Sequence, residues 1–129
     1  MRHATKKRAA LNRVAAEWRH KFLLEIGRCE RCNHAYLGHL SVHEITNSHA
    51  RKHALMERAA VLVVCQYCHA RFHRKGMAGK LEALAYLYHR RGYDFDLDKI
   101  HALRGDNWPE LSEVMLEVKR IIEGERDES

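Results

Sequence analysis

Two short stretches decide the fold: Cys29-Glu30-Arg31-Cys32 and Cys65-Gln66-Tyr67-Cys68, which contain all four cysteines of the 129-residue chain. Each Cys-x-x-Cys pair can hold a metal ion from a tight turn, and two pairs complete the tetrahedral thiolate shell of a structural zinc site. Two disulfides are the alternative. The chain begins Met-Arg-His without the apolar segment of a signal peptide, so we expect a reducing compartment, where disulfides are rare. The sequence therefore predicts zinc on Cys29, Cys32, Cys65 and Cys68.

A second group of metal-ligating residues lies between and after these pairs. The segment 40–45 alternates apolar and polar residues, which predicts a short strand with His43 near its end. The apolar run 59–64 predicts a buried second strand, and a helix is expected to follow it. Residues four apart share one face of a helix, as His69 and His73 would. We expect the three histidines to surround one divalent cation, because neutral imidazole suits zinc, nickel and similar metals. The alternative is three solvated histidines.

The order of these motifs resembles that of the HNH endonuclease family, whose ββα-metal fold often contains a zinc knot. The resemblance covers about residues 22–75. It implies that His43 is the metal ligand of the first strand. It also implies that His69 and His73 are the paired helix ligands of the colicin-type DNase branch. Small proteins of this family are typically bacterial or phage-like, which implies a location in the cytoplasm of a bacterium or a phage-infected host.

The sequence departs from the family pattern at two positions. Glu44 follows the first-strand ligand, where the family normally has the histidine that activates water. The asparagine that usually opens the second strand is replaced by Ala59-Ala60, and we expect Asn47 or Ser48 in the intervening loop to take its place. The resemblance therefore implies a variant active site.

Glu44 has three interpretations. A carboxylate can act as a general base toward water. It can also bind the metal through oxygen, which favours magnesium or manganese, or it can be a strand-end residue without a role. We predict that Glu44 is the base, with His49 in the loop as the alternative.

The loop also contains candidate phosphate ligands. An arginine near the metal can hold a nonbridging phosphate oxygen through two hydrogen bonds. We predict Arg51 for this role and Arg58 as the reserve. The alternative is that these charges only solvate the loop, as most surface charges do.

Charge is distributed unevenly along the chain, which has a formal charge of +6. Residues 1–91 contain 18 Lys or Arg and 6 Asp or Glu, whereas residues 92–129 contain 5 and 11. A positive field around a metal site fits a polyanion, because phosphate neutralisation supplies most nonspecific affinity. We therefore expect double-stranded DNA as the partner; a basic surface without a ligand is the alternative. No apolar run approaches the about 20 residues of a membrane helix, so no membrane partner is expected.

Helices are predicted on both sides of the core. Residues 4–27 have apolar side chains at three- and four-residue steps and read as one basic helix. A further helix is expected at about 79–91. A short helix capped by Asp98 should follow and end at residue 103, and the last helix should begin at Asn107. The acids at 94–98 resemble the start of a calcium loop, but the required glycine and closing glutamate are absent. The last helix has an apolar face that would either pack on the core or form a homodimer, made of Leu111, Val114, Met115, Val118, Ile121 and Ile122.

These patterns predict one domain, mainly α with a small β-hairpin. A zinc-braced ββα-metal core (29–75) would be flanked by a basic N-terminal helix (1–28) and a C-terminal helical extension (76–129). The expected function is a metal-dependent endonuclease that nicks one DNA strand per site with Mg²⁺, Mn²⁺, Ni²⁺ or Zn²⁺. The alternatives are a zinc-stabilised DNA-binding module without catalysis and an adaptor that docks a partner through its last helix. The expected catalytic residues are Glu44, His43, His73, His69, Arg51 and His49.

Overall fold

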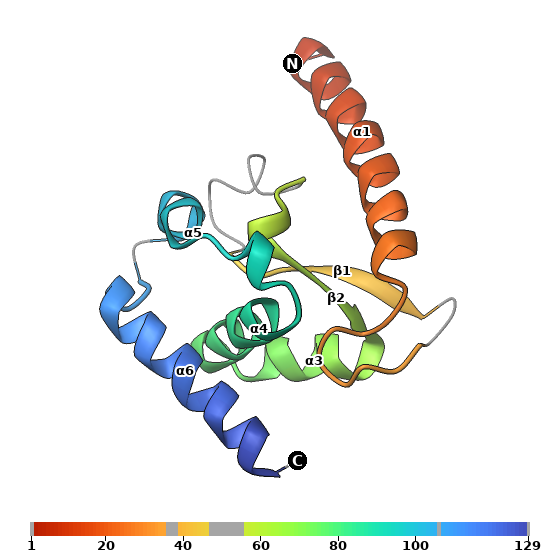
Figure 1. Cartoon of the computed structure of the whole chain (residues 1–129). Coiled ribbons are helices and arrows are strands. Elements are labelled where there is room, and N and C mark those ends of the chain that lie inside the picture. The colour runs from red at the N-terminus through yellow and green to blue at the C-terminus, as the bar shows by residue number, and fades with distance from the viewer. Residues whose placement is uncertain (1, 36–38, 47–55, 106, 129) are drawn as a thin grey trace.

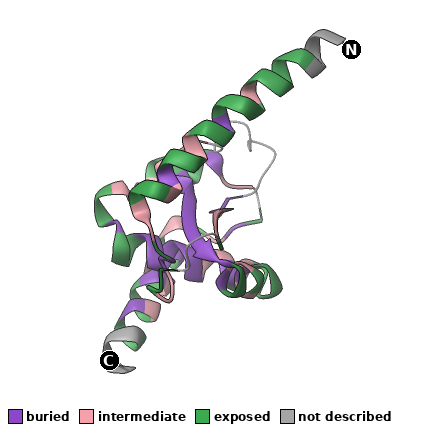
Figure 2. Ribbon diagram, turned by 90° about the vertical axis from the view of Figure 1, so that its right-hand side faces the viewer, coloured by how far each residue is buried: buried purple, intermediate pink, exposed green. Residues whose placement is uncertain are grey.

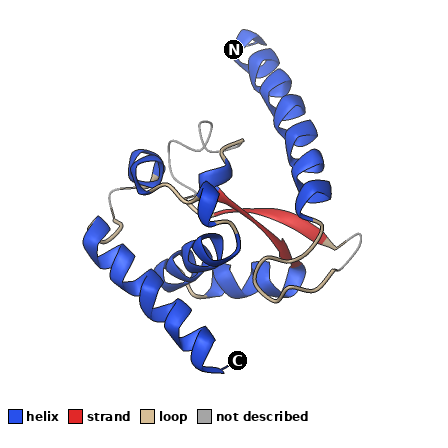
Figure 3. Cartoon of the chain, viewed as in Figure 1, coloured by secondary structure: helices blue, strands red, loops and turns tan. Residues whose placement is uncertain are grey.

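The structure is a computed structural model that describes residues 2–35, 39–46, 56–105 and 107–128, with the backbone alone for 2–5 and 125–128. Within these ranges the chain is mainly helical with one small antiparallel hairpin, which confirms the predicted fold class (Figures 1 and 3). The elements in chain order are α1 (Arg2–Ile26), β1 (Leu40–Glu44), the 3-10 helix η1 (Arg58–Ala60), β2 (Val61–Cys65), α3 (Gln66–Arg74), α4 (Met77–Arg90), the 3-10 helix η2 (Gly92–Asp94), α5 (Leu97–Leu103) and α6 (Leu111–Glu128).

The hairpin is covered by helices on both faces. β1 and β2 pair antiparallel, with His43 opposite Leu62 and Glu44 opposite Val61. Successive strand residues point to opposite faces. Val61 and Val63 accordingly pack with the second half of α1, whereas Leu62 and Val64 belong to the larger core formed with the other helices. Because both faces are covered, β2 is an unbroken run of buried residues, as its sequence predicted.

The larger core is built around α4. This helix crosses α3 so closely that a Cβ on Gly79 would lie 2.1 Å from the carbonyl oxygen of Phe72, which only glycine avoids. On its other side α4 packs against α6, where Val114, Val118 and Ile122 are buried. The apolar face of the last helix therefore packs on the core of its own chain. A homodimer through α6 stays a prediction, and it would have to use the other side of that helix.

Two predicted helix starts are wrong by a few residues. The short helix α5 is capped by Asp96, whose side chain accepts a hydrogen bond from the Lys99 amide, and Asp98 lies in its first turn. The last helix begins at Leu111 instead of Asn107, because Trp108 is buried in the core and Pro109 precedes the first turn. Tertiary packing of the indole ring has shifted the boundary.

Helix α1 extends well beyond the body of the protein (Figures 1 and 2). Its carboxyl half packs on the hairpin through Phe22 and the stacked ring of Trp18. In its amino half, residues 6–10 and 12–14 are exposed. The predicted apolar stripe is thus buried only where the sheet lies beneath it. Among the described residues, no helix has the length and apolar character needed to cross a membrane.

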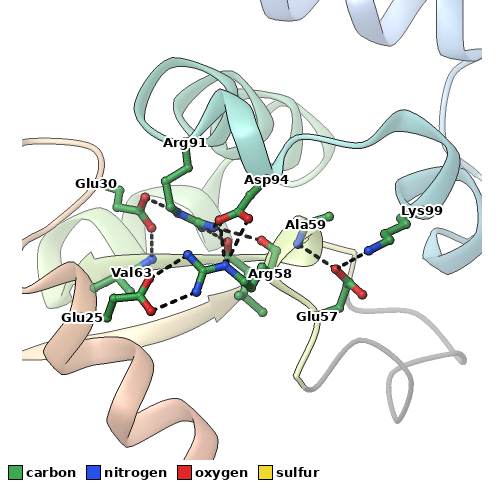
Figure 4. A network of polar contacts seen from close by, with 10 residues as sticks. Glu25, Glu30, Glu57, Arg58, Ala59, Val63, Arg91, Asp94 and Lys99 are labelled. Atoms are coloured by element: carbon green, nitrogen blue, oxygen red, sulfur yellow. Dashed lines mark hydrogen bonds and ion pairs between the residues drawn. The ribbon is translucent and has the colours of Figure 1, made fainter.

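A buried ionic network ties four segments together (Figure 4). Arg91 is 2% exposed and donates to the Glu30 carboxylate at 2.6 Å, the Asp94 carboxylate at 2.6 Å and the Val61 carbonyl at 2.6 Å. The second oxygen of Glu30 accepts a hydrogen bond from the Val63 amide at 2.9 Å. Glu30 lies between the first two cysteines, so this network fixes the first cysteine pair against β2 and the end of α4.

Replacing Arg91 with methionine should destabilise the protein strongly. The change leaves the buried Glu30 carboxylate and the Val61 carbonyl without their donor, and breaking a buried ion pair from one side costs about 3–5 kcal/mol. Urea denaturation of the metal-loaded protein measures this loss. Arg120→Met is the matched control, because it removes an exposed pair with Glu117 and should change stability little. Equal midpoints for the two variants would contradict the role of Arg91.

Candidate metal centres

The four cysteines gather into one cluster. Cys29 and Cys32 lie in the turn after α1, Cys65 ends β2, and Cys68 lies in the first turn of α3. Their sulfur atoms all lie within 4.8 Å of one another, and none is in a disulfide. A tetrahedral ion with metal–sulfur bonds of about 2.3 Å holds its sulfurs about 3.8 Å apart. The separation of 4.0 Å between Cys32 and Cys65 is close to this value. The four thiols can therefore share one structural metal ion.

The first cysteine pair is shaped by its backbone. Asn33 follows it with φ of 65°, a left-handed conformation that asparagine tolerates, and its amide bonds back to the Cys29 carbonyl at 2.8 Å. Burial raises the pKa of the Cys29 thiol, but hydrogen bonds from the backbone of Cys32, Cys65 and Arg31 outweigh burial and lower this pKa to about 7. These hydrogen bonds favour the thiolate of Cys29, the form that binds a metal, whereas burial raises the pKa of Cys32 and of Cys68.

A cation from the same turn lies against the sulfurs. The Arg31 guanidinium donates to the Cys68 sulfur at 3.5 Å and to the Glu82 carboxylate of α4 at 3.1 Å. Glu82 also accepts from Arg71 at 2.8 Å and from Lys75 at 2.6 Å. Burial raises the pKa of Glu82, but Arg71 and Lys75 lower it to about 2. Glu82 therefore remains ionised and holds Arg31 where its charge offsets the negative charge of the thiolates.

The three predicted histidines form a second, separate cluster. His43 comes from β1, and His69 and His73 come from one face of α3. Their ring centroids are 4.8–5.3 Å apart, and one nitrogen of each ring lies within 4.8 Å of the others. His69 Nδ1 is 3.2 Å from Ser41 Oγ, which lies on the same face of β1 as His43. If Nδ1–H donates to Ser41, the other nitrogen is free to bind a metal, a common arrangement around metal-binding histidines.

His43 fits a metal ligand best. Its side chain is 4% exposed, yet neither ring nitrogen has a hydrogen-bond partner among the described residues. Buried polar atoms are nearly always paired, so an unpaired imidazole calls for an explanation. Burial, followed by the charges of His69 and His73, lowers the pKa of His43 to about 4. The ring is thus neutral and keeps a lone pair available. A cation bound by the three histidines would satisfy one of its two nitrogens.

His43 and His73 border a small cavity of about 50 Å³, large enough for an ion and a few waters. Its lining residues are His43, Glu44, Phe72, His73, Gly76 and Lys80. His73 is the most exposed of the three histidines, so the cluster opens to solvent on its side. A ligand could therefore reach the metal position from outside.

The carboxylate of Glu44 does not point toward the histidines. Glu44 pairs with Val61 on the face of the hairpin that α1 covers, and its carboxylate accepts a hydrogen bond from Arg19 of α1. His43 is the adjacent residue and faces α3, because neighbours on a strand point to opposite sides. Glu44 borders the cavity at the strand end, but its charge is directed to Arg19. This geometry disfavours Glu44 as a ligand of the same metal.

The remaining candidates divide into two groups. Arg51, His49, Asn47 and Ser48 lie outside the described residues. Arg58, the reserve phosphate ligand, donates to Asp94 at 3.0 Å and to Glu25 at 2.7 Å, so it belongs to the ionic network of Figure 4. Its guanidinium is already neutralised by two carboxylates.

Three residues of the two centres were missed by sequence reasoning. Arg31 could have been suspected from its position inside a Cys-x-x-Cys pair. Glu82 and Lys80 carry no sequence signal, because both lie on an ordinary amphipathic helix and reach the centres only through the close crossing of α4 over α3.

Comparisons with protein-family models, curated proteins and solved structures found no match to this chain. The resemblance to the HNH endonucleases therefore stays a prediction, carried by its motifs and by the geometry of the two clusters.

The chain should bind two metal ions, and His73→Ala should bind one. Removing an imidazole from a three-histidine site leaves two ligands, whereas the four cysteines stay intact. Elemental analysis after exhaustive dialysis measures the metal content. His89→Ala is the control, since His89 lies nine residues beyond Lys80 on α4, about 13 Å along the helix axis. A wild-type protein with a single ion that His73→Ala retains would contradict the second centre.

Proposed function

We propose that this protein is a metal-dependent endonuclease of the HNH type that hydrolyses phosphodiester bonds in DNA. One observation carries the proposal: His43, buried and without hydrogen-bond partners, converges with His69 and His73 at the edge of a solvent-accessible cavity. A strand-plus-helix histidine cluster beside a four-cysteine cluster is the arrangement that the HNH resemblance implies.

The two centres have different roles in this proposal. The four cysteines hold zinc, since a closed tetrahedral set of thiolates is typical of structural zinc. The three histidines hold a divalent cation, which when bound stabilises negative charge on the phosphate and on the leaving oxygen. Three protein ligands leave coordination positions open on such an ion, as a catalytic site requires.

DNA is the proposed substrate because a cationic helix projects from the hairpin that carries His43 (Figure 1). The amino half of α1 exposes Lys6, Lys7, Arg8 and Arg13 without an acidic residue between them. The carboxyl half of α1 covers the face of the hairpin on which Arg19 and Glu44 meet, opposite the face of His43. A projecting cationic helix is long enough to follow the backbone of a duplex beyond the cleavage site, and a single site cuts one strand at a time.

Water activation is the step that the described residues support least directly. A general base must come within hydrogen-bond reach of the attacking water. Glu44 borders the cavity but is held by Arg19. Either Glu44 or His49, the two bases that the sequence indicates, would activate the water, and mutation of Glu44 distinguishes between them.

The contact between Arg19 and Glu44 also favours a second candidate function. If the carboxylate serves only to dock α1 on the hairpin, the chain is a zinc-stabilised DNA-binding module that has lost catalysis. This candidate predicts salt-sensitive DNA binding without cleavage under any metal.

Supercoiled plasmid should be nicked by the wild-type protein with at least one of Mg²⁺, Mn²⁺, Ni²⁺ and Zn²⁺. His73→Ala should lower the rate by about 100-fold or more, because loss of a ligand costs at least as much as the loss of its supporting shell. Gel electrophoresis of the plasmid measures the rate, with His89→Ala as the control. Nicking by His73→Ala at the wild-type rate would rule out this site.

Glu44→Gln separates the two bases in the same assay. Loss of a general base costs about 100- to 10,000-fold. A loss of this size would identify Glu44 as the base, whereas an unchanged rate would direct attention to His49. Tight plasmid binding without nicking under every metal would establish the binding module instead.

Changing Lys6, Lys7, Arg8 and Arg13 together to glutamine should weaken DNA binding and flatten its salt dependence. Each lost phosphate contact reduces the slope of log K against log salt by about 0.9, so four contacts give a change of about 3–4. Fluorescence anisotropy of a labelled duplex between 50 and 200 mM salt, the range over which such binding changes steeply, measures the slope. Exposed Lys99 and Lys119, changed to glutamine, are the controls. An unchanged slope would remove α1 from the DNA interface.

A further inference from the structure

One wall of the cavity beside the histidines is formed by residues that are not among the predicted catalytic residues. Gly76 and Lys80 line it from α4, which begins directly after Gly76. Lys80 is four residues beyond Gly76, and its amide bonds to the Gly76 carbonyl at 3.1 Å, so both lie on one side of the first helical turn. The amino end of a 14-residue helix therefore lies at the rim of the same cavity as His43 and His73.

The position of this helix end is determined by Gly79. Because Gly79 has no side chain, α4 approaches the backbone of α3 at Phe72, the residue before His73. Gly76 provides no side-chain cap for the first amides of α4. The first turn of a helix carries N–H groups without partners inside the helix and a partial positive charge. These groups favour an anion at this rim.

Lys80 is the cation that lines the histidine cavity among the described residues. Arg71 and Lys75 donate to Glu82, Arg19 donates to Glu44, and Arg58 is bound by two carboxylates. Among the residues that the structure describes, Lys80 has no carboxylate within ion-pair distance. Its ammonium group lies 5.7 Å from the centre of the Trp108 ring, and its side chain lines the cavity together with His43 and His73.

We propose that Lys80 and the first turn of α4 form the phosphate-binding part of the histidine site. The ammonium group would hold a nonbridging oxygen of the scissile phosphate while the helix end offers backbone N–H donors. This inference rests on the proposed function for the identity of the anion, but its binding chemistry needs only a phosphate group. It supplies, within the described residues, the cation that was expected from Arg51.

The test is the binding of inorganic phosphate to the protein with both metal centres loaded, measured by calorimetry and by ³¹P NMR. Lys80→Met should weaken phosphate binding by about 10-fold or more, as expected for loss of a charge-assisted hydrogen bond. Lys80→Arg should retain most of the affinity. Lys119→Met changes the net charge equally on an exposed face of α6 and should have no effect. All variants should keep the wild-type metal content.

The outcomes separate this inference from the proposed function. Phosphate binding that Lys80→Met weakens supports the inference even if the wild-type protein nicks no plasmid, which would contradict only the nuclease proposal. If the protein does nick, Lys80→Met should lose turnover while its metal content is unchanged, and Lys80→Arg should restore it. Equal phosphate affinity in wild type and Lys80→Met would overturn the inference, as would loss of affinity in Lys119→Met to the same degree.

Discussion

The contact between Glu30 and Arg91 is the constraint on which both centres depend. The two residues are 61 positions apart, and their charged groups are almost fully buried. One oxygen of Glu30 accepts from Arg91 while the other accepts from the amide of Val63, so the carboxylate joins the first cysteine pair to the middle of β2 and to the end of α4. A buried charge without its partner is costly, which makes this geometry strongly preferred over its alternatives.

Helix α4 transmits this constraint from one centre to the other. Its carboxyl end is followed by Arg91, its middle carries Glu82 beside the cysteines, and its first turns carry Gly79 and Lys80 beside the histidines. A helix of 14 residues spans about 21 Å. Because the helix is rigid, it fixes the distance between the residues at its two ends without help from the loops of the chain. The close crossing over α3 at Gly79 then fixes the distance between the helix and the histidines.

Periodicity and spacing predicted much of this protein. The two cysteine pairs indicated a shared metal site because paired Cys-x-x-Cys motifs are typical of zinc ligands. The four sulfur atoms do lie together in the structure, as this prediction requires. The strand at 40–45, the apolar run before Cys65 and the helix with His69 and His73 were also placed nearly correctly, since local patterns determine such elements. The convergence of His43 with the helix histidines followed from that order.

Sequence reasoning was weakest where a side chain's surroundings come from distant segments. Glu44 was interpreted from its neighbour His43, but alternation along β1 places its carboxylate on the side of α1, where Arg19 binds it. Arg58 looked like a free loop cation, yet Glu25 and Asp94 neutralise it. Neither partner is adjacent in sequence, so no local pattern could reveal them.

Helix α3 belongs to both the cysteine cluster and the histidine cluster. This helix has nine residues and no side-chain cap at its amino end, so it is too short to be stable alone, and it carries Cys68 as well as both helix histidines. Binding of an ion by the cysteines would anchor its first turn, and only then would His69 and His73 keep a fixed spacing from His43. The two centres should therefore fill in sequence, with the cysteines first. If zinc fills the cysteine cluster, as proposed, zinc depletion would disturb the histidine cluster without any change to the histidines themselves.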